Sequence, residues 1–225
     1  MSVFVGFPVI IGDQTLDSPV LSPIADFSAL GDGVGDDATA LNAMFDFIRT
    51  SGNNVVGSEA NILDRYVKWV IDGGGRNYVV GTSLNATGIR NNGPIIFRNM
   101  TFIWQGGTTS NVLDLTDSRG TIWENVHIWN TSAYPTKIGI LQARNITGRV
   151  ASENTFRSCT VRGYYSITGW MNYASEVCTY DGCSVWNYGN DAGSYAMVLQ
   201  SEPKVAVTSA YQTIDTASEA FTILN

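Results

Sequence analysis

Charged residues are scarce in this chain, and this scarcity excludes some functions. Lys, Arg, Asp and Glu make up 15% of its 225 residues, against about 25% in ordinary soluble domains. The 13 basic and 20 acidic residues give a net charge of -7, and no basic run is longer than two residues. Nucleic-acid binding without sequence preference requires clustered cations, so we expect no nucleic-acid partner.

Metal ligands and long apolar runs are also scarce. The chain has one histidine, His127, and three cysteines, Cys159, Cys178 and Cys183. Protein zinc sites need more of these residues at close spacing, so we predict no metal and no cofactor. No stretch approaches the roughly 18 to 20 apolar residues that span a bilayer, so we expect no membrane insertion. The N-terminus lacks a basic region and a continuous apolar run, and the sequence therefore predicts no secretion signal.

What the chain does have is a repeat. Four segments, which start at Phe97, Trp123, Phe156 and Tyr180, read aromatic, charged, turn-former, small apolar, polar, apolar. Their starts lie 26, 33 and 24 residues apart (97 to 123, 123 to 156, 156 to 180). This spacing is typical of a solenoid, in which each turn buries its apolar face against its neighbours.

A second apolar run follows at a steady offset. It begins 15 residues after three of the four starts, at 112, 138 and 195, and comes earlier in the third repeat, at 165–167. A fifth turn is predicted at 205–207 and 220–223. Parallel strands without intervening helices exclude a βαβ fold. We therefore predict an all-β fold, a right-handed single-stranded parallel β-helix.

Each position of the repeat has a predicted place. The third residue makes a corner that needs a left-handed backbone, and the fourth and sixth point inward. Cys159 and Cys183 fall at the fourth position and read as core residues, although a disulfide between adjacent turns stays open. The second position alternates in charge, which specifies register. The corner residues are Asn99, Asn125, Ser158 and Gly182, and the alternating residues are Arg98, Glu124, Arg157 and Asp181.

The seventh position carries the candidate site. It places Trp129, Arg162 and Trp186 in one outward column, after Ile103. A guanidinium between two indole rings favours a cation–π stack. The column is interpreted as a subunit interface or as a platform for sugar rings, and cover by a loop of the same chain stays a third alternative.

The N-terminal part differs in composition. Residues 1–24 hold three of the six prolines and predict an extended arm, with the β-helix over 25–225. A helix is predicted at about 36–50 from the spacing of Leu41, Met44, Phe45 and Ile48. Strand signals dominate from about residue 68 onward.

Residues 24–50 resemble the N-terminal motif of the pectate-lyase-like superfamily. The matching residues are Asp26, Phe27, Ala29, Gly31, Asp32, Gly33, Asp36, Asp37, Ala40 and Leu41, while Ser28 and Gly35 depart from the pattern. Residues 75–80 with Leu84 are similar to the strand that follows the motif in that family. The resemblance implies a helix that caps the N-terminal end of the β-helix, with structural aspartates.

Within that superfamily the chain looks most like bacteriophage tailspikes and related receptor-binding proteins. The resemblance implies a structural component on the outer surface of a virion, in the tail. It also implies a homotrimer that binds bacterial surface polysaccharide and joins other tail or baseplate proteins through residues 1–24.

The alternative function is a polysaccharide depolymerase of the same fold, a glycoside hydrolase or lyase. A glycosidase would need two carboxyl groups about 5 to 9.5 Å apart. The sequence assigns no catalytic residue. The available carboxylates are Asp114, Asp117, Glu124, Glu153, Glu176, Asp181, Asp191 and Glu202.

Overall fold

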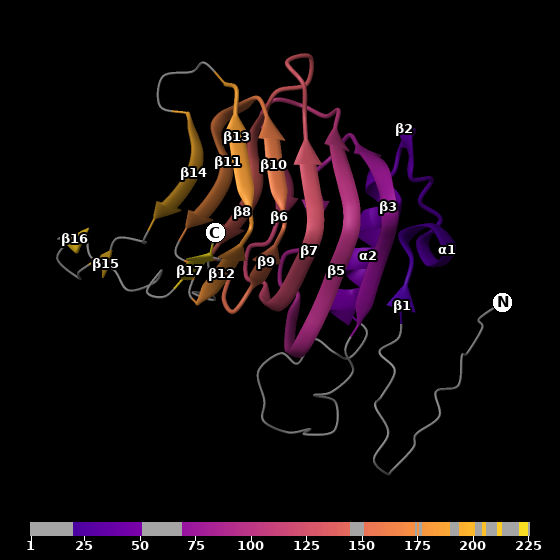
Figure 1. The fold of residues 1–225 in the computed structure, drawn as a ribbon, viewed down its shortest axis with the longest axis horizontal. Coiled ribbons are helices and arrows are strands. Elements are labelled where there is room, and N and C mark those ends of the chain that lie inside the picture. The colour runs from indigo at the N-terminus through magenta and orange to yellow at the C-terminus, as the bar shows by residue number, and fades with distance from the viewer. Residues whose placement is uncertain are drawn as a thin grey trace, which may run out of the picture.

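The chain winds into a parallel β-helix with two helices at its N-terminal end (Figure 1). This computed structural model describes residues 20–50, 69–144, 151–173, 175, 177–189, 194–200, 204–205, 211–212 and 221–224. Within the two large sheets all strand pairings are parallel, as the sequence predicts.

The larger sheet has ten strands and wraps around a corner. Its main path runs through β1 (Val20–Leu21), β3 (Val70–Val80), β5 (Arg90–Trp104), β7 (Arg119–Trp129), β9 (Thr155–Arg157), β12 (Cys178–Asp181) and β17 (Phe221–Leu224). β2 (Asp32–Asp36) pairs with β3, while β10 (Thr160–Gly163) pairs with β7 and β13 (Ser184–Asn187) pairs with β10. The long strands β3, β5 and β7 therefore contribute to both sides of the corner.

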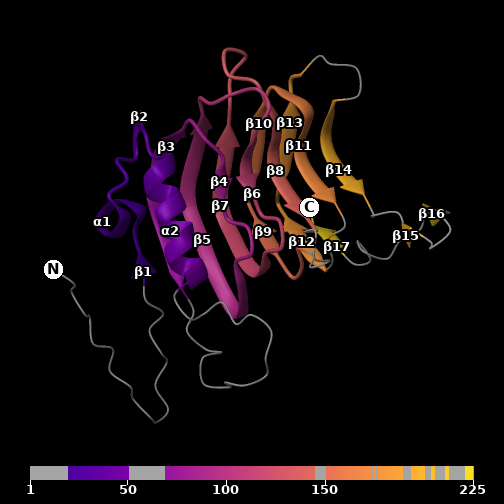
Figure 2. The ribbon, with the colours of Figure 1, turned by 180° about the vertical axis from the view of Figure 1, so that it is seen from behind.

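The second sheet has five strands in the order β14 (Tyr195–Gln200), β11 (Tyr165–Tyr173), β8 (Thr136–Ala143), β6 (Asn111–Asp114) and β4 (Leu84–Asn85). Figure 2 shows these strands following one another from the N-terminal helices toward the other end. A separate hairpin pairs β15 (Lys204–Val205) with β16 (Tyr211–Gln212) in antiparallel fashion.

The four repeats lie over one another as predicted. Phe97 pairs with Trp123, Trp123 with Phe156, and Phe156 with Tyr180. The corner residues have the expected left-handed backbone, with φ values of 56° at Asn99, 53° at Asn125, 51° at Ser158 and 59° at Gly182. Local turn chemistry and the stacking of turns therefore agree.

Aromatic rings fill the interior. The four aromatic residues that start the repeats are buried, and successive rings stack with centroid distances of 4.2, 6.5 and 5.5 Å. Trp170 of β11 packs edge-on against Phe156 and Tyr180, at interplanar angles of 81° and 82°. The inward column is thus one continuous apolar core that links the turns.

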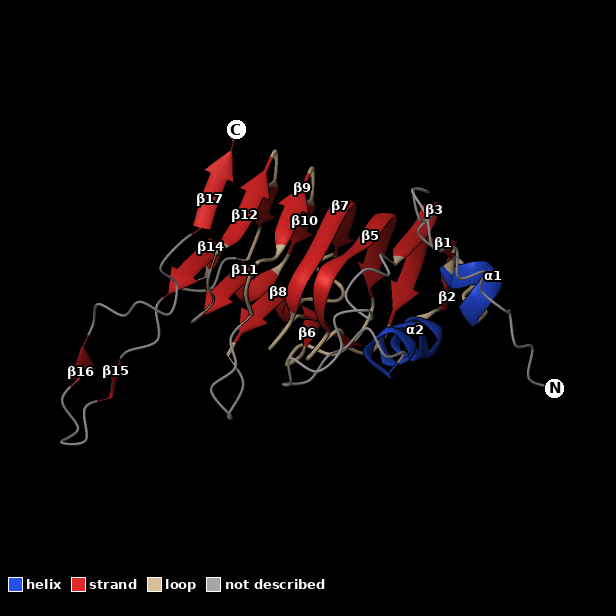
Figure 3. Cartoon of the chain, turned by 90° about the horizontal axis from the view of Figure 1, so that it is seen from below, coloured by secondary structure: helices blue, strands red, loops and turns tan. Residues whose placement is uncertain are grey.

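The predicted capping helix is present. α2 (Ala38–Thr50) buries Leu41, Met44, Phe45 and Ile48, and the ring of Phe45 lies 5.6 Å from that of Phe97. Together with α1 (Pro23–Phe27), it covers the N-terminal end of the β-helix (Figure 3). α2 begins at residue 38 rather than 36 because Asp36 is the last residue of β2.

The aspartates of the N-terminal motif accept hydrogen bonds from backbone amides. The buried carboxylate of Asp37 accepts hydrogen bonds from the amides of Leu30 (2.5 Å) and Gly31 (3.2 Å). The carboxylate of Asp36 accepts from Ala38 N at 2.9 Å and from Gly81 N at 3.1 Å. These contacts satisfy amides at the start of α2 and in neighbouring loops, which makes the two side chains structural.

The predicted constant offset between the start of a repeat and its second strand is wrong in the first repeat. Asn111, Ile138, Thr168 and Tyr195 share one register, so the offsets are 14 (97 to 111), 15, 12 (156 to 168) and 15. The early start in the third repeat is confirmed, because Tyr165 pairs with Thr136 before an irregularity in the ladder. A slip of one residue turns a strand over, and the register depends on loop length and on what packs inside.

The predicted fifth turn is also wrong in its register. β17 pairs with β12, so Ile223 lies beside Tyr180 in the larger sheet instead of continuing the second one. Val205 pairs antiparallel with Tyr211. The alternation of apolar residues at 221 and 223 fits the inward face of either sheet, so the sequence could not choose between them. Residues 206–210 and 213–220 lie outside the described part of the chain.

The end of the predicted arm belongs to the β-helix. Val20 pairs with Val70 and Leu21 with Ile71, while the Ser22 hydroxyl accepts a hydrogen bond from Ala25 N at 3.4 Å and caps α1. The predicted boundary at residue 24 therefore falls inside α1. Residues 1–19, the remainder of the predicted arm, lie outside the described residues.

Candidate functional site

The predicted outward column is present at the corner between the two large sheets. Trp129, Arg162 and Trp186 occupy one register on β7, β10 and β13. The Cζ atom of Arg162 lies 4.7 Å from the centre of the Trp129 ring, within the range of a cation–π contact. Arg162 is exposed, and Trp186 exposes 49% of its surface. Trp129 is half-buried, so among the described residues the column is open to solvent at Arg162 and Trp186.

Two tyrosines extend this surface, and sequence reasoning missed them. Tyr164 and Tyr188 lie two residues beyond Arg162 and Trp186, with ring centroids 5.7 Å apart. Tyr188 exposes 47% of its surface. Their spacing of two residues from Arg162 and Trp186 is the spacing of side chains on one face of a strand, and it could have identified them. Gly163, however, indicates a turn, so the sequence did not predict that the outward face continues. We call Trp129, Arg162, Tyr164, Trp186 and Tyr188 the corner platform.

Two asparagines fix the backbone under the corner platform. Asn130 accepts from Tyr164 N at 2.5 Å and donates to Tyr164 O at 2.9 Å. Asn187 makes the same pair of bonds with Tyr165, both at 3.0 Å. Tyr188 N also donates to Gly163 O at 2.7 Å. The platform side chains therefore project from a hydrogen-bonded frame, which suits a binding surface.

The charge of Arg162 is unpaired among the described residues. Five other arginines make ion pairs there: Arg49 with Asp46, Arg90 with Asp117, Arg98 with Asp72, Arg119 with Glu153 and Arg157 with Glu124.

The predicted register of the alternating charges at the second position of the repeat is confirmed. Arg98, however, pairs with Asp72 of the preceding turn and not with Glu124.

His127 lies next to the corner platform, and no carboxylate in the described part of the chain is its hydrogen-bond partner. Its Nε2 is 3.0 Å from the side-chain oxygen of Asn125, and its ring centroid is 6.5 Å from that of Trp129. Burial lowers the pKa of His127 below its usual value, because the charged imidazolium loses hydration. This arrangement gives the ring a structural place in the ladder of outward residues.

Cys159 and Cys183 occupy the predicted core positions, and neither forms a disulfide. The Cys159 thiol donates to Trp123 O at 3.3 Å, and that of Cys183 donates to Phe156 O at 3.5 Å. Burial raises the pKa of Cys159 and of Cys178. The protonated thiols of Cys159 and Cys178 pack as small core side chains, whereas a hydrogen bond with Cys159 lowers the pKa of Cys183 to about 7.

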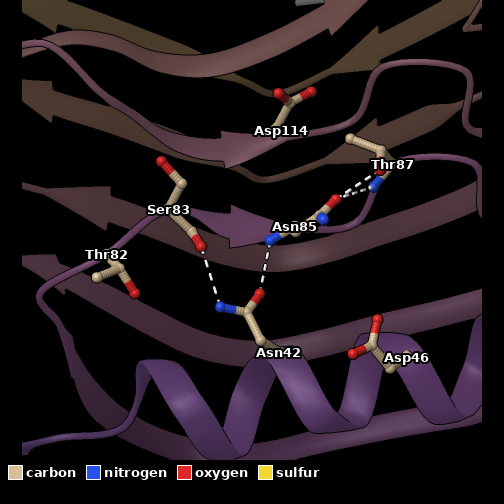
Figure 4. Close-up of a pocket in the computed structure, with 7 residues that line it drawn as sticks. All are labelled: Asn42, Asp46, Thr82, Ser83, Asn85, Thr87 and Asp114. Carbon is tan, nitrogen blue, oxygen red and sulfur yellow. Dashed lines mark hydrogen bonds between the residues drawn. The ribbon is translucent and has the colours of Figure 1, made fainter.

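A polar groove beside α2 is the second candidate (Figure 4). It has a volume of about 520 Å³, and the side chains of Asp46 and Asp114 line it on either side of Asn85. Asn42 bridges Ser83 O (3.0 Å) and Asn85 N (2.7 Å). The other lining residues are Thr82 and Thr87, so no aromatic ring faces the groove.

Of the remaining candidate carboxylates, Asp181 lies beside Arg157 in register, and three others are ion-paired. Asp117, Glu124 and Glu153 form ion pairs with arginines. Glu176, Asp191 and Glu202 lie outside the described residues. In the described part of the chain, no three His, Cys, Asp or Glu side chains gather as metal ligands.

Comparisons with known proteins add little. No family model matches the chain, and no curated protein matches it. A solved structure, ORF18 of Geobacillus virus E2, is similar at 12% identity and a TM-score of 0.34, over 81% of this chain and 47% of that one. The chain thus spans about half the length of that protein, and so low a TM-score carries no conclusion about function. Among the described residues, no helix has the length and hydropathy that a membrane crossing requires.

Proposed function

We propose that this protein is a structural component on the outer surface of a virion, a tailspike-like or fibre-like protein that binds a glycan of the host surface. The observation that carries the proposal is the exposed corner platform on a rigid β-helix. The resemblance of residues 24–50 to the pectate-lyase-like motif supports the virion assignment.

The composition of the corner platform favours a glycan. Four aromatic rings and one guanidinium project from three adjacent turns, and two of the rings are about half exposed. Aromatic faces stack on the apolar faces of sugar rings, and tyrosine hydroxyls supply hydrogen bonds at the rim. A protein interface over the same surface would bury the charge of Arg162, at a cost unless the partner supplied an anion.

A glycan array of bacterial capsular and lipopolysaccharides tests this proposal. We expect the full chain to bind at least one glycan, and Trp186→Ala to weaken that binding more than tenfold because it removes the most exposed indole. Val34→Ala is the control, since Val34 is 79% exposed in β2 at the opposite end of the β-helix. Absence of binding across the array, or equal binding by Trp186→Ala, would refute the proposal.

The proposed assembly is a homotrimer that docks on other tail or baseplate proteins through residues 1–24. We expect light scattering to give three times the chain mass of 24.4 kDa. A trimer suits the β-helix because further copies can cover its exposed flanks. A concentration-independent mass of one chain would contradict this part of the proposal.

The second candidate function is polysaccharide cleavage. The groove beside α2 supports it, because the carboxylates of Asp46 and Asp114 line one polar cavity of sufficient size for a sugar. If the groove is catalytic, incubation with a bound polysaccharide will release new reducing ends, and Asp114→Asn will abolish their release. Binding without release leaves the protein a receptor-binding component.

A further inference from the structure

We infer that the corner platform holds a subsite for a sugar that bears a carboxylate, such as a uronic acid, with Arg162 as the residue that recognises the carboxylate. This inference rests on the proposed function and names the class of sugar that the site takes. Its starting point is the contrast between Arg162 and the five ion-paired arginines.

Arg162 is prepared to bind an anion. Its guanidinium is exposed, faces no described carboxylate and rests on the Trp129 ring at 4.7 Å. A stacked guanidinium keeps its N–H edge free, and that edge matches the two oxygens of a carboxylate. Stacking also reduces the side-chain freedom that binding would remove.

Trp186 supplies the face on which the sugar ring lies. It is the direct neighbour of Arg162 on the next strand, at the spacing of about 4.8 Å between parallel strands. Its ring is 49% exposed. A pyranose stacked on Trp186 would bring a carboxylate at its edge within reach of Arg162.

The tyrosines place further polar groups beside the same ring. Tyr188 follows Trp186 by two residues on the same strand and its extension, and its ring packs against that of Tyr164. Both phenols can donate or accept a hydrogen bond with a sugar hydroxyl. The hydrogen bonds of Asn130 and Asn187 keep this arrangement in place before a ligand binds.

The experiment compares two sugars that differ at one carbon. Methyl β-glucuronide and methyl β-glucoside are titrated into the full-length ¹⁵N-labelled protein, and the six tryptophan indole N–H signals are followed by NMR. The Trp186 signal is assigned by its loss in Trp186→Phe. We expect the glucuronide to shift the Trp186 signal with at least tenfold higher affinity than the glucoside, while the signal of buried Trp123 stays in place.

Substitutions of Arg162 measure how much its guanidinium contributes to the affinity for the glucuronide. Arg162→Gln should weaken glucuronide binding at least tenfold, and Arg162→Lys should restore part of it, because an ammonium keeps the charge but not the planar fork. Arg157→Gln is the matched control: Arg157 is exposed, lies in the same sheet and the same repeat, and pairs with Glu124. This control makes the same change in net charge and should leave the affinity within twofold. Melting curves confirm that each variant is folded.

Each possible result of these titrations supports the inference or overturns it. Equal affinity for the two sugars, or unchanged binding by Arg162→Gln, overturns the inference, and the glycan array still stands as the test of the proposed function. Binding of neither sugar overturns it as well. Acetate at the same concentrations is the last probe: an equal shift of the Trp186 signal would show a site for a bare carboxylate and refute the stacked sugar.

Discussion

Trp123→Ala should lower the free energy of unfolding by about 4 kcal/mol, within the range of about 3 to 5 kcal/mol for large aromatic residues in a core. Trp123 is 1% exposed and stacks on Phe97 at 4.2 Å, with Phe156 and Phe45 at 6.5 and 6.4 Å. Its removal leaves a cavity in the middle of the aromatic column, which the rigid strands on both sides cannot close.

The measurement is the melting temperature by circular dichroism. For a chain of this size about 1 kcal/mol corresponds to about 2 to 4 °C, so a fall of about 8 to 16 °C is expected. Trp186→Ala is the matched control, since that ring is half exposed and its loss should cost less than about 1 kcal/mol. Equal melting temperatures for the two variants would show that the column does not link the turns.

Gly163→Ala should destabilise the protein by about 3 to 5 kcal/mol, although it adds a single methyl group. A Cβ atom at this position would lie 1.7 Å from the side-chain oxygen of Asn130. Asn130 would have to leave, and its two hydrogen bonds to the backbone of Tyr164 would be lost. Overpacking typically costs about 1 to 3 kcal/mol, and each lost bond adds about 1 kcal/mol.

Chemical denaturation of single and double variants measures this effect. Gly107→Ala is the control, because no atom lies within 4 Å of the added Cβ there. In the background of Asn130→Ala, Gly163→Ala should cost less than in the parent chain, since the clashing oxygen is gone and only the strain of a side chain at the φ of 154° remains. If Gly163→Ala costs the same in both backgrounds, the close approach to Asn130 is not the cause.

The corners and the stacking of the repeats could be predicted because they depend on local chemistry. Asn and Gly, which tolerate a left-handed backbone, hold three of the four third positions, and Ser158 adopts the same backbone at the remaining one. The alternation of apolar and polar residues then fixed which side chains face inward. Trp129, Arg162 and Trp186 were found in this way, since they lie at a constant distance from these corners.

The second sheet and the far end of the chain could not be predicted to the residue. Asn111 lies where Val112 was expected, and β17 joins β12 in the larger sheet. An alternating pattern fits two registers or two sheets equally well. The choice depends on loop lengths and on what packs inside, which no local pattern contains.

By itself, the sequence determined a coiled, parallel β architecture, its corners, its capping helix and one outward column of tryptophan and arginine. Only the tertiary structure decided that Arg162 rests on Trp129 without a described carboxylate, and that Tyr164 and Tyr188 extend the same surface. The physical reason is that a residue's periodicity sets the direction of its side chain, whereas its contacts depend on residues far away in the sequence, such as the 24 and 34 positions that separate Arg162 from Trp186 and Asn130 from Tyr164.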